Sequence, residues 1–206
     1  LTSQGMVRSD DMTVSVPAST SNLGPGFDFL GLALGMYLTA SAVTTERGQG
    51  AGHAVRYSAG PDDRSGAGSW APEDALFLKA LGVFQRRTGV ALPGLSITVT
   101  SEIPVGRGFG SSGAAVAAAL LLAAGAMPQS HGPAAPTRED IISMALEVEG
   151  HPDNGTASLL GGCTLAVPTP GETPDVTVVK APVHDSLHLA VAWPETPLPT
   201  PEARRA

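Results

Sequence analysis

At the centre of the chain stands the sequence Pro104-Val105-Gly106-Arg107-Gly108-Phe109-Gly110-Ser111-Ser112-Gly113-Ala114-Ala115. Before it, residues 95–100 alternate apolar and hydroxyl side chains, a period of two that predicts a β-strand. After it, residues 116–124 are almost entirely alanine and leucine, which favour a helix. The sequence therefore predicts a strand, a glycine-rich turn and a helix, in that order.

This turn has the chemistry of a phosphate-binding site. Glycines let the backbone pass close to a ligand, and the unpaired N–H groups of the first helical turn attract anions together with the helix dipole. Ser111 and Ser112 add hydroxyls where a metal ion or the terminal phosphates would lie. The stretch is not a Walker loop, and it lacks the acidic residue that a Rossmann fingerprint carries ~20 residues later. A serine-capped turn before an ordinary helix is the alternative.

Composition narrows the class of protein. The 206 residues are 42% hydrophobic and 15% charged, a profile typical of a soluble globular chain with a sizeable core. The net charge of −7 argues against nucleic acid or an anionic membrane surface as the main partner. Cys163 is the only cysteine, so we expect no internal disulfide and a reducing, cytoplasmic compartment. No apolar run reaches the roughly 18 residues of a membrane span.

Turn and cap signals divide the rest of the chain. Residues 1–11 are predicted to be a disordered extension, with Met12 as a plausible start. Further strands are predicted at 12–17 (ending at Pro17), 31–43, 54–58, 164–167, 176–180 and 187–193, and a loop at 18–28. Helices are predicted at 72–88, 137–149 and 157–160, with another beginning at 199. The first of these helices should bury Leu76, Leu78, Leu81, Val83 and Phe84.

One acid of the predicted helix 137–149 is a candidate magnesium ligand. The helix begins with a capping box at Thr137 and Asp140. Glu149 lies at its other end, on the apolar stripe. Four other side chains of the helix are predicted to face water: Asp140, Ser143, Met144 and Glu147. Mg²⁺ prefers carboxylate and phosphate oxygens together, so Glu149 would suit the ion if it lay beside the glycine turn. A solvated acid at a helix end is the alternative.

Three motifs, in order along the chain, resemble the GHMP small-molecule kinases. The central stretch is similar to their phosphate loop, Pro-x-x-x-Gly-Leu-Gly-Ser-Ser-Ala-Ala, with Phe109 in place of leucine and Gly113 in place of the first alanine. Residues 16–28 (Val-Pro-Ala-Ser-Thr-Ser-Asn-Leu-Gly-Pro-Gly-Phe-Asp) and 149–154 (Glu-Gly-His-Pro-Asp-Asn) resemble the homoserine kinases within that family. Residues 200–204 (Thr-Pro-Glu-Ala-Arg) are a weaker match.

The resemblance implies an α+β fold. Residues 12–163 would form a GHMP kinase N-terminal domain, like the second domain of ribosomal protein S5. Residues 164–206 would begin an incomplete, ferredoxin-like C-terminal domain. The implied reaction is phosphorylation of the side-chain hydroxyl of L-homoserine by ATP and Mg²⁺. Another GHMP kinase acting on a different small alcohol, or a truncated non-catalytic ATP-binding fragment, are the alternatives, and a homodimer stays open.

The resemblance also assigns roles to residues. The ATP phosphates would be wrapped by Pro104, Val105, Gly106, Arg107, Gly108, Phe109, Gly110, Ser111, Ser112, Gly113 and Ala114. Glu149 and Ser112 would hold Mg²⁺, and Glu149 and Asn154 would be catalytic. The substrate pocket would be lined by Asn22, Asp28, His151, Asn154 and Arg204. Since asparagine cannot accept a proton at neutral pH, catalysis would depend on positioning and charge neutralisation. Asp153 is expected to brace the turn.

Overall fold

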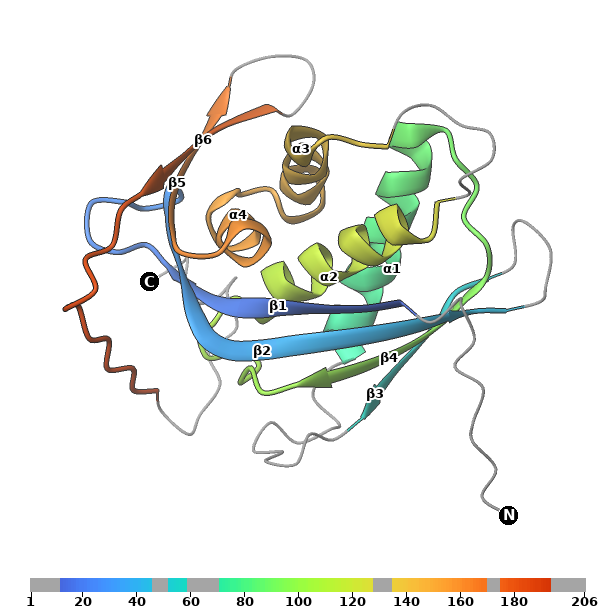
Figure 1. The fold of residues 1–206 in the computed structure, drawn as a ribbon, viewed down its shortest axis with the longest axis horizontal. Helices are drawn as coiled ribbons and strands as arrows, with labels where there is room; N and C mark the ends of the chain where they lie inside the picture. Colours follow the sequence, from blue (N-terminus) through green and yellow to red (C-terminus); the bar gives the residue numbers. More distant parts are fainter. Residues whose placement is uncertain (1–11, 46–51, 59–70, 128–134, 170–174, 194–206) are drawn as a thin grey trace.

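The computed structural model describes residues 12–45, 52–58, 71–127, 135–169 and 175–193 (Figure 1). The predicted extension 1–11 and the helix predicted from 199 lie outside these ranges. The described strands are β1 (Met12–Ser21), β2 (Leu30–Thr44), β3 (Ala54–Ser58), β4 (Leu95–Ser101), β5 (Cys163–Thr169) and β6 (Asp175–Ala181). The described helices are α1 (Ala71–Thr88), α2 (Ser111–Gly125), α3 (Arg138–Glu149) and α4 (Asp153–Leu160).

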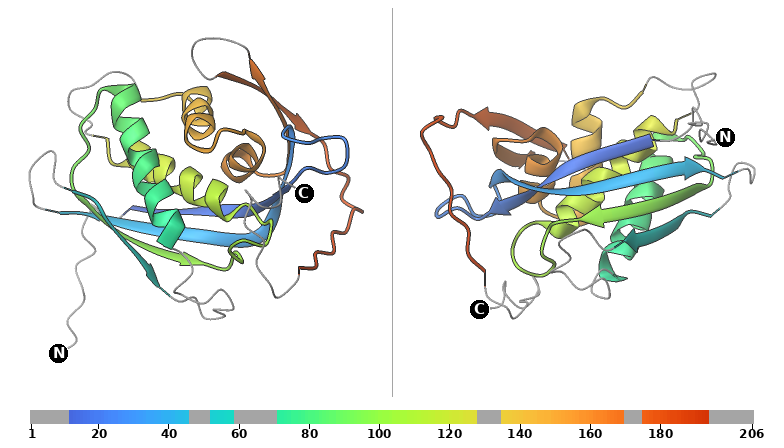
Figure 2. Two further views of the ribbon diagram at one scale, coloured as in Figure 1. Left: turned by 180° about the vertical axis from the view of Figure 1, so that it is seen from behind. Right: turned by 60° about the horizontal axis from the view of Figure 1, so that its bottom comes forward.

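All described strands join one mixed sheet, with the order β3-β4-β2-β5-β6 and with β1 paired to β2. Only β3 and β4 run parallel, because α1 crosses between them. The long strand β2 pairs with β1, β4 and β5 in turn. The helices cover one face of the sheet, and the views of Figure 2 show the same layering from other sides.

Helix α2 is the centre of the core. Eleven of its fifteen residues are buried, because it packs against β1, α1, α3 and α4 at once. Its alanines have no long side chains, so these neighbours can approach from every side. The largest side chains around it, Phe77 and Phe84 of α1 and Leu38 of β2, are 0% exposed. Packing against these four elements therefore holds α2 in place.

The prediction for β1 was wrong at its end. The strand does not stop at Pro17 but runs to Ser21, so the predicted loop 18–28 loses its first residues. The pairing shifts at this point: Pro17 lies opposite Tyr37, and Ala18 lies opposite Leu34. Proline lacks an N–H for the ladder, and a bulge is where a strand tolerates it.

Three other expectations were wrong. The segment 187–193 forms no strand and hydrogen-bonds to no described strand, so its alternating pattern lacks a partner. Helix α4 begins at Asp153, four residues before the predicted start, because an acid stabilises a first helical turn. Leu78 of α1 is 42% exposed, while Phe77 takes its place in the core.

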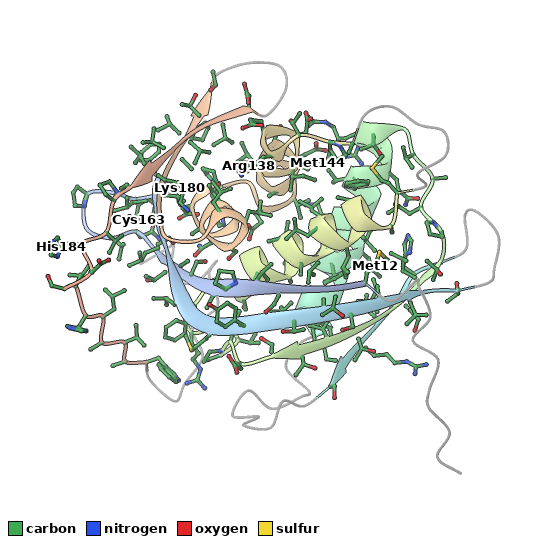
Figure 3. The ribbon with its side chains drawn as sticks, in the orientation of Figure 1. Met12, Arg138, Met144, Cys163, Lys180 and His184 are labelled. Carbon is green, nitrogen blue, oxygen red and sulfur yellow. The ribbon has the colours of Figure 1, made fainter. Side chains whose placement is uncertain are left out.

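Two of the α3 side chains that were predicted to face water are buried instead. Ser143 is 5% exposed and Met144, labelled in Figure 3, is 2% exposed, because α1 covers this side of α3. Glu147 is not simply solvated, since Arg86 and Arg87 of α1 form ion pairs with it. A helix between two neighbours buries a wider face than its sequence stripe indicates.

The other predicted elements are confirmed within a few residues, including the strand Ala54–Ser58. Strands β5 and β6 continue the sheet that contains β1 to β4. The predicted domain boundary at residue 163 stays a prediction. None of the described helices is long and apolar enough to cross a lipid bilayer.

The capping box of α3 gives a first testable prediction. Thr137 Oγ1 accepts a hydrogen bond from the Asp140 N–H, and the Asp140 carboxylate accepts one from the Thr137 N–H. Thr137→Ala is expected to lower the free energy of unfolding by about 1 kcal/mol. Urea unfolding measures this loss, and Thr137→Ser is the matched control because it keeps the capping oxygen. An equal loss in both variants would contradict a capping role.

Candidate active site

The glycine-rich turn has the backbone of an anion site. Gly106, Gly108 and Gly110 take the left-handed φ values of 65°, 77° and 65°, which residues with a Cβ rarely adopt. Helix α2 starts directly after Gly110, and the Ala114 N–H donates to the Gly110 carbonyl at 2.9 Å. Among the described residues, the N-cap Gly110 has no side-chain cap hydrogen bond, and no acid lies in the first turn of α2. The predicted order of strand, turn and helix is confirmed, and this helix mouth suits an anion.

Two glycines let the start of α2 touch its neighbours. A Cβ on Gly110 would lie 2.2 Å from Ser19 Oγ and 2.8 Å from Asn154 Oδ1. A Cβ on Gly113 would lie 3.0 Å from the Gly155 nitrogen in α4. The departure from the family pattern at Gly113 therefore brings α2 and α4 into close contact.

Glu149 lies beside the loop. Ser112 Oγ donates to Glu149 Oε1 at 3.1 Å, while Oε2 is buried and has no hydrogen-bond partner among the described residues. The residue as a whole keeps partial exposure, but its carboxylate is enclosed. Burial raises the pKa of Glu149 to about 7, with the His151 charge and the Ser112 hydrogen bond acting in the opposite direction. Glu149 is therefore not a solvated acid at a helix end.

The turn between α3 and α4 is organised by a buried acid. Asp153 is 0% exposed, and its Oδ1 lies 2.7 Å from His151 Nδ1 and accepts from the Asn154 N–H at 2.8 Å. Burial raises the pKa of Asp153, but the hydrogen bonds from His151 and Asn154 outweigh it, so the net pKa is below its ordinary value. Asp153 is thus ionised at neutral pH, and its expected role of bracing the turn is confirmed.

Asn154 is packed against the glycine loop and held from β1. Its Oδ1 accepts from Ser19 Oγ at 3.0 Å, and its Nδ2 donates to Ser21 Oγ at 3.1 Å. Neither serine was singled out from the sequence, where residues 18–28 read as a loop. No local signal marks them, because residues 19–21 all carry hydroxyls and the direction of each side chain depends on the pairing with β2.

The other predicted substrate residues are less closely tied to this cluster. Asn22 Oδ1 accepts from the Asp28 N–H at 2.9 Å, and both residues have left-handed φ values, 58° and 59°. Asn22 therefore closes a turn that starts directly after Ser21. Arg204 lies outside the described residues. Substrate roles for Asn22, Asp28 and Arg204 stay predictions.

Phe109 fills the underside of the loop. It is 5% exposed, and its ring meets Trp193 edge to face, with centroids 5.0 Å apart and planes at 88°. Its carbonyl accepts from the Ser19 N–H at 3.0 Å. Phe109, which stands where the family pattern has leucine, is thus a buried apolar side chain, and its aromatic partner comes from the segment that was predicted as a strand.

Comparison with known sequences finds kinases similar to this chain. A family model described as the GHMP kinases N terminal domain matches residues 75–162. A homoserine kinase from Synechocystis sp. is 42% identical over 157 residues, covering 75% of this chain and 47% of that protein. One from Leifsonia xyli is 37% identical over 212 residues, covering 97% of this chain and 59% of that protein. The chain thus spans about half to three fifths of the length of these relatives.

Two solved structures share the fold. The crystal structure of homoserine kinase from Cytophaga hutchinsonii superposes with a TM-score of 0.64 at 24% identity, covering 100% of this chain and 62% of that chain. Mevalonate kinase from L. major, in complex with R-mevalonate, has a TM-score of 0.58 at 19% identity and covers 83% of this chain and 53% of that chain. At these identities the likeness supports the fold alone.

Proposed function

Since the chain carries a GHMP kinase N-terminal domain, we propose that the protein transfers the γ-phosphoryl group of ATP to the side-chain hydroxyl of L-homoserine, giving O-phospho-L-homoserine. The observation that carries this proposal is one cluster: the start of α2 behind three left-handed glycines, with Glu149 bound to Ser112 and Asn154 packed against Gly110. The homoserine kinase relatives support homoserine as the substrate.

The residues present fit a magnesium ion. Glu149 offers a buried carboxylate oxygen without a partner among the described residues, and Ser112 offers a hydroxyl beside it. The described residues hold no group of three or more His, Cys, Asp or Glu side chains that could bind a metal by themselves. Mg²⁺ commonly uses one or two protein ligands together with phosphate oxygens. Glu149 and Ser112 would hold the ion, which would neutralise charge on the phosphates.

Other groups of the chain would position the phosphates and the substrate hydroxyl. The N–H groups of residues 106–113 would hold the phosphates, as backbone donors at a helix N-terminus do. Asn154 would hydrogen-bond the substrate hydroxyl in line with the γ-phosphorus, and Asp153 would orient His151 beside it. Phosphoryl transfer has a loose transition state, so a site without a strong base can still be effective.

Several wider features belong to the same proposal. The reaction would be a step of threonine biosynthesis and would take place in the cytoplasm. Residues 164–206 would lead into a ferredoxin-like C-terminal domain, to which the predicted substrate residue Arg204 belongs. A homodimer stays a prediction.

Substrate screening tests the proposed function. The complete gene product is incubated with MgATP and homoserine, mevalonate or galactose, and ADP release is followed by a coupled assay. Homoserine is expected to give the highest kcat/KM. Faster turnover of mevalonate or galactose would indicate a different small alcohol. ATP binding without turnover of any alcohol would support a non-catalytic ATP-binding protein.

Asn154→Ala tests the positioning of the hydroxyl. Loss of one hydrogen bond that matters mainly in the transition state is expected to lower kcat about tenfold, with KM for ATP changed less than about twofold. Steady-state kinetics measures both constants. The reverse pattern, a normal kcat with a raised KM for ATP, would indicate that Asn154 contacts the nucleotide and not the substrate hydroxyl.

A further inference from the structure

Ser19 of β1 connects the glycine loop with Asn154 and Ser158 of α4. Ser19 is 0% exposed. Its N–H donates to the Phe109 carbonyl at 3.0 Å, and its Oγ donates to Asn154 Oδ1 at 3.0 Å and lies 3.3 Å from the Asn154 carbonyl oxygen. Ser158 Oγ donates to Ser19 Oγ at 3.4 Å. Ser19 thus binds both Phe109 of the glycine loop, 90 positions along the chain, and Asn154 of α4, 135 positions along the chain.

Ser19 faces inward directly after the register shift between β1 and β2. Before the bulge, Met12, Val14 and Val16 point toward the core, so the even-numbered residues face the helices. After the shift at Pro17 and Ala18, the side chains that reach α4 are those of Ser19 and Ser21. The shift skips residues 35 and 36 of β2, and the neighbours Ala18 and Ser19 are both 0% exposed, so the alternation of inward and outward side chains along β1 is interrupted here. Ser15, before the shift, lies on the exposed face, where its Oγ is 3.2 Å from Thr39 Oγ1.

The contacts also determine which side of the Asn154 amide is available. Oδ1 accepts from Ser19, and one N–H of Nδ2 goes to Ser21. The second N–H of Nδ2 is the donor that remains for a ligand. Held in this way, Asn154 would donate to the substrate hydroxyl oxygen or to a phosphate oxygen.

We propose that Ser19 is a positioning residue of the phosphoryl-transfer reaction: it fixes the Asn154 amide against the glycine loop and acts only through Asn154. This inference rests on the proposed function for its kinetic part. Its structural part, the fixed Asn154 amide, can be measured without any activity.

The first experiment is kinetic, on the complete gene product with MgATP and homoserine. Ser19→Ala is expected to lower kcat about tenfold while KM for ATP changes less than about twofold, as expected for a lost transition-state contact. In an Asn154→Ala background the same substitution should change kcat less than about twofold. Ser15→Ala is the matched control, because Ser15 lies on the same strand and its Oγ is bound to Thr39 on the exposed face. An unchanged kcat in Ser19→Ala, or an equal fall in both backgrounds, would overturn the proposal.

The second experiment needs no substrate. The 206 residues contain two asparagines, Asn22 and Asn154, so selective ¹⁵N-asparagine labelling gives two side-chain NH₂ signals from this chain. Asn154→Ala assigns them. The Asn154 signal is expected to exchange slowly with water, and to exchange at least about tenfold faster in Ser19→Ala but not in Ser15→Ala. Equal exchange in wild type and Ser19→Ala would overturn the positioning role. If no alcohol is phosphorylated but this difference is found, the proposed function fails and the structural part stands.

Discussion

Glu149→Gln is expected to lower kcat for homoserine phosphorylation at least about a hundredfold while leaving the fold intact. Glutamine keeps the shape of the side chain and can still accept from Ser112, but it removes the negative charge that would hold Mg²⁺ beside the phosphates. Glu147→Gln is the matched control, since Glu147 lies on the same helix and pairs with Arg86 and Arg87 at the surface. Near-normal turnover by Glu149→Gln would show that Glu149 is not a magnesium ligand.

The same substitution should stabilise the ligand-free protein at high pH. The pKa of Glu149 in the fold, about 7, is raised above the ordinary 4.5 by burial. The corresponding stability is fully present below pH 4.5 and is lost as the pH rises through 7, because the unfolded chain ionises first. At pH 8 the wild-type protein would therefore be less stable than Glu149→Gln by about 3 kcal/mol.

Urea unfolding without Mg²⁺ or ATP, at pH 8 and at pH 5, measures this difference. The gain from Glu149→Gln is expected to shrink toward pH 5, where the carboxyl is mostly protonated in the fold. Glu147→Gln should show no gain at either pH. If the free energies of unfolding of Glu149→Gln and wild type differed by the same amount at both pH values, the ionisation of Glu149 would not be the cause of the difference. The loss of turnover and the gain of stability would come from one enclosed carboxylate.

Gly110→Ala is expected to reduce kcat/KM for ATP and homoserine by at least about a hundredfold. The added methyl would lie 2.2 Å from Ser19 Oγ and 2.8 Å from Asn154 Oδ1, so both side chains would have to move. The left-handed φ of 65° adds backbone strain of roughly 1 to 2 kcal/mol. Displacements of about 1 Å in a site that works by positioning can cost about a hundredfold in rate.

Gly89→Ala separates strain from displacement. Gly89 has a similar φ of 69° after the end of α1, and a Cβ there meets nothing within 4 Å. In thermal unfolding this control should lose only the stability that the left-handed φ costs, and it should keep its kcat/KM. If both variants retained turnover, the contact of Gly110 with Asn154 would have no catalytic importance.

The local patterns of the sequence predicted the strand, glycine turn and helix around Gly110, because each element is set by neighbouring residues. The same holds for the capping box at Thr137 and for the end of α3 at Gly150. The resemblance to a kinase family indicated which distant motifs would meet, and the structure brings Ser112, Glu149 and Asn154 together.

Features that depend on contacts between distant segments could not be predicted from these patterns. The bulge after Pro17 results from pairing with β2, so nothing in residues 12–21 alone shows that Ser19 turns inward. The period of α3 predicted that Met144 faces water, but Met144 is buried because α1 lies against it. The pattern at 187–193 predicted a strand, but a strand needs a neighbour, and no described strand pairs with it. Tertiary context overrides local preference at each of these points.

The contact between Ser19 and Asn154 joins residues 135 positions apart. A chain emerging from the ribosome would complete β1, β2, α1 and the glycine turn well before Asn154, the partner of Ser19, is made. Contacts of such long sequence separation form slowly, since the intervening chain must be ordered first. We therefore expect a nascent chain that ends before residue 150 to collapse around α2 without a catalytic centre, which would mature only after α4 docks.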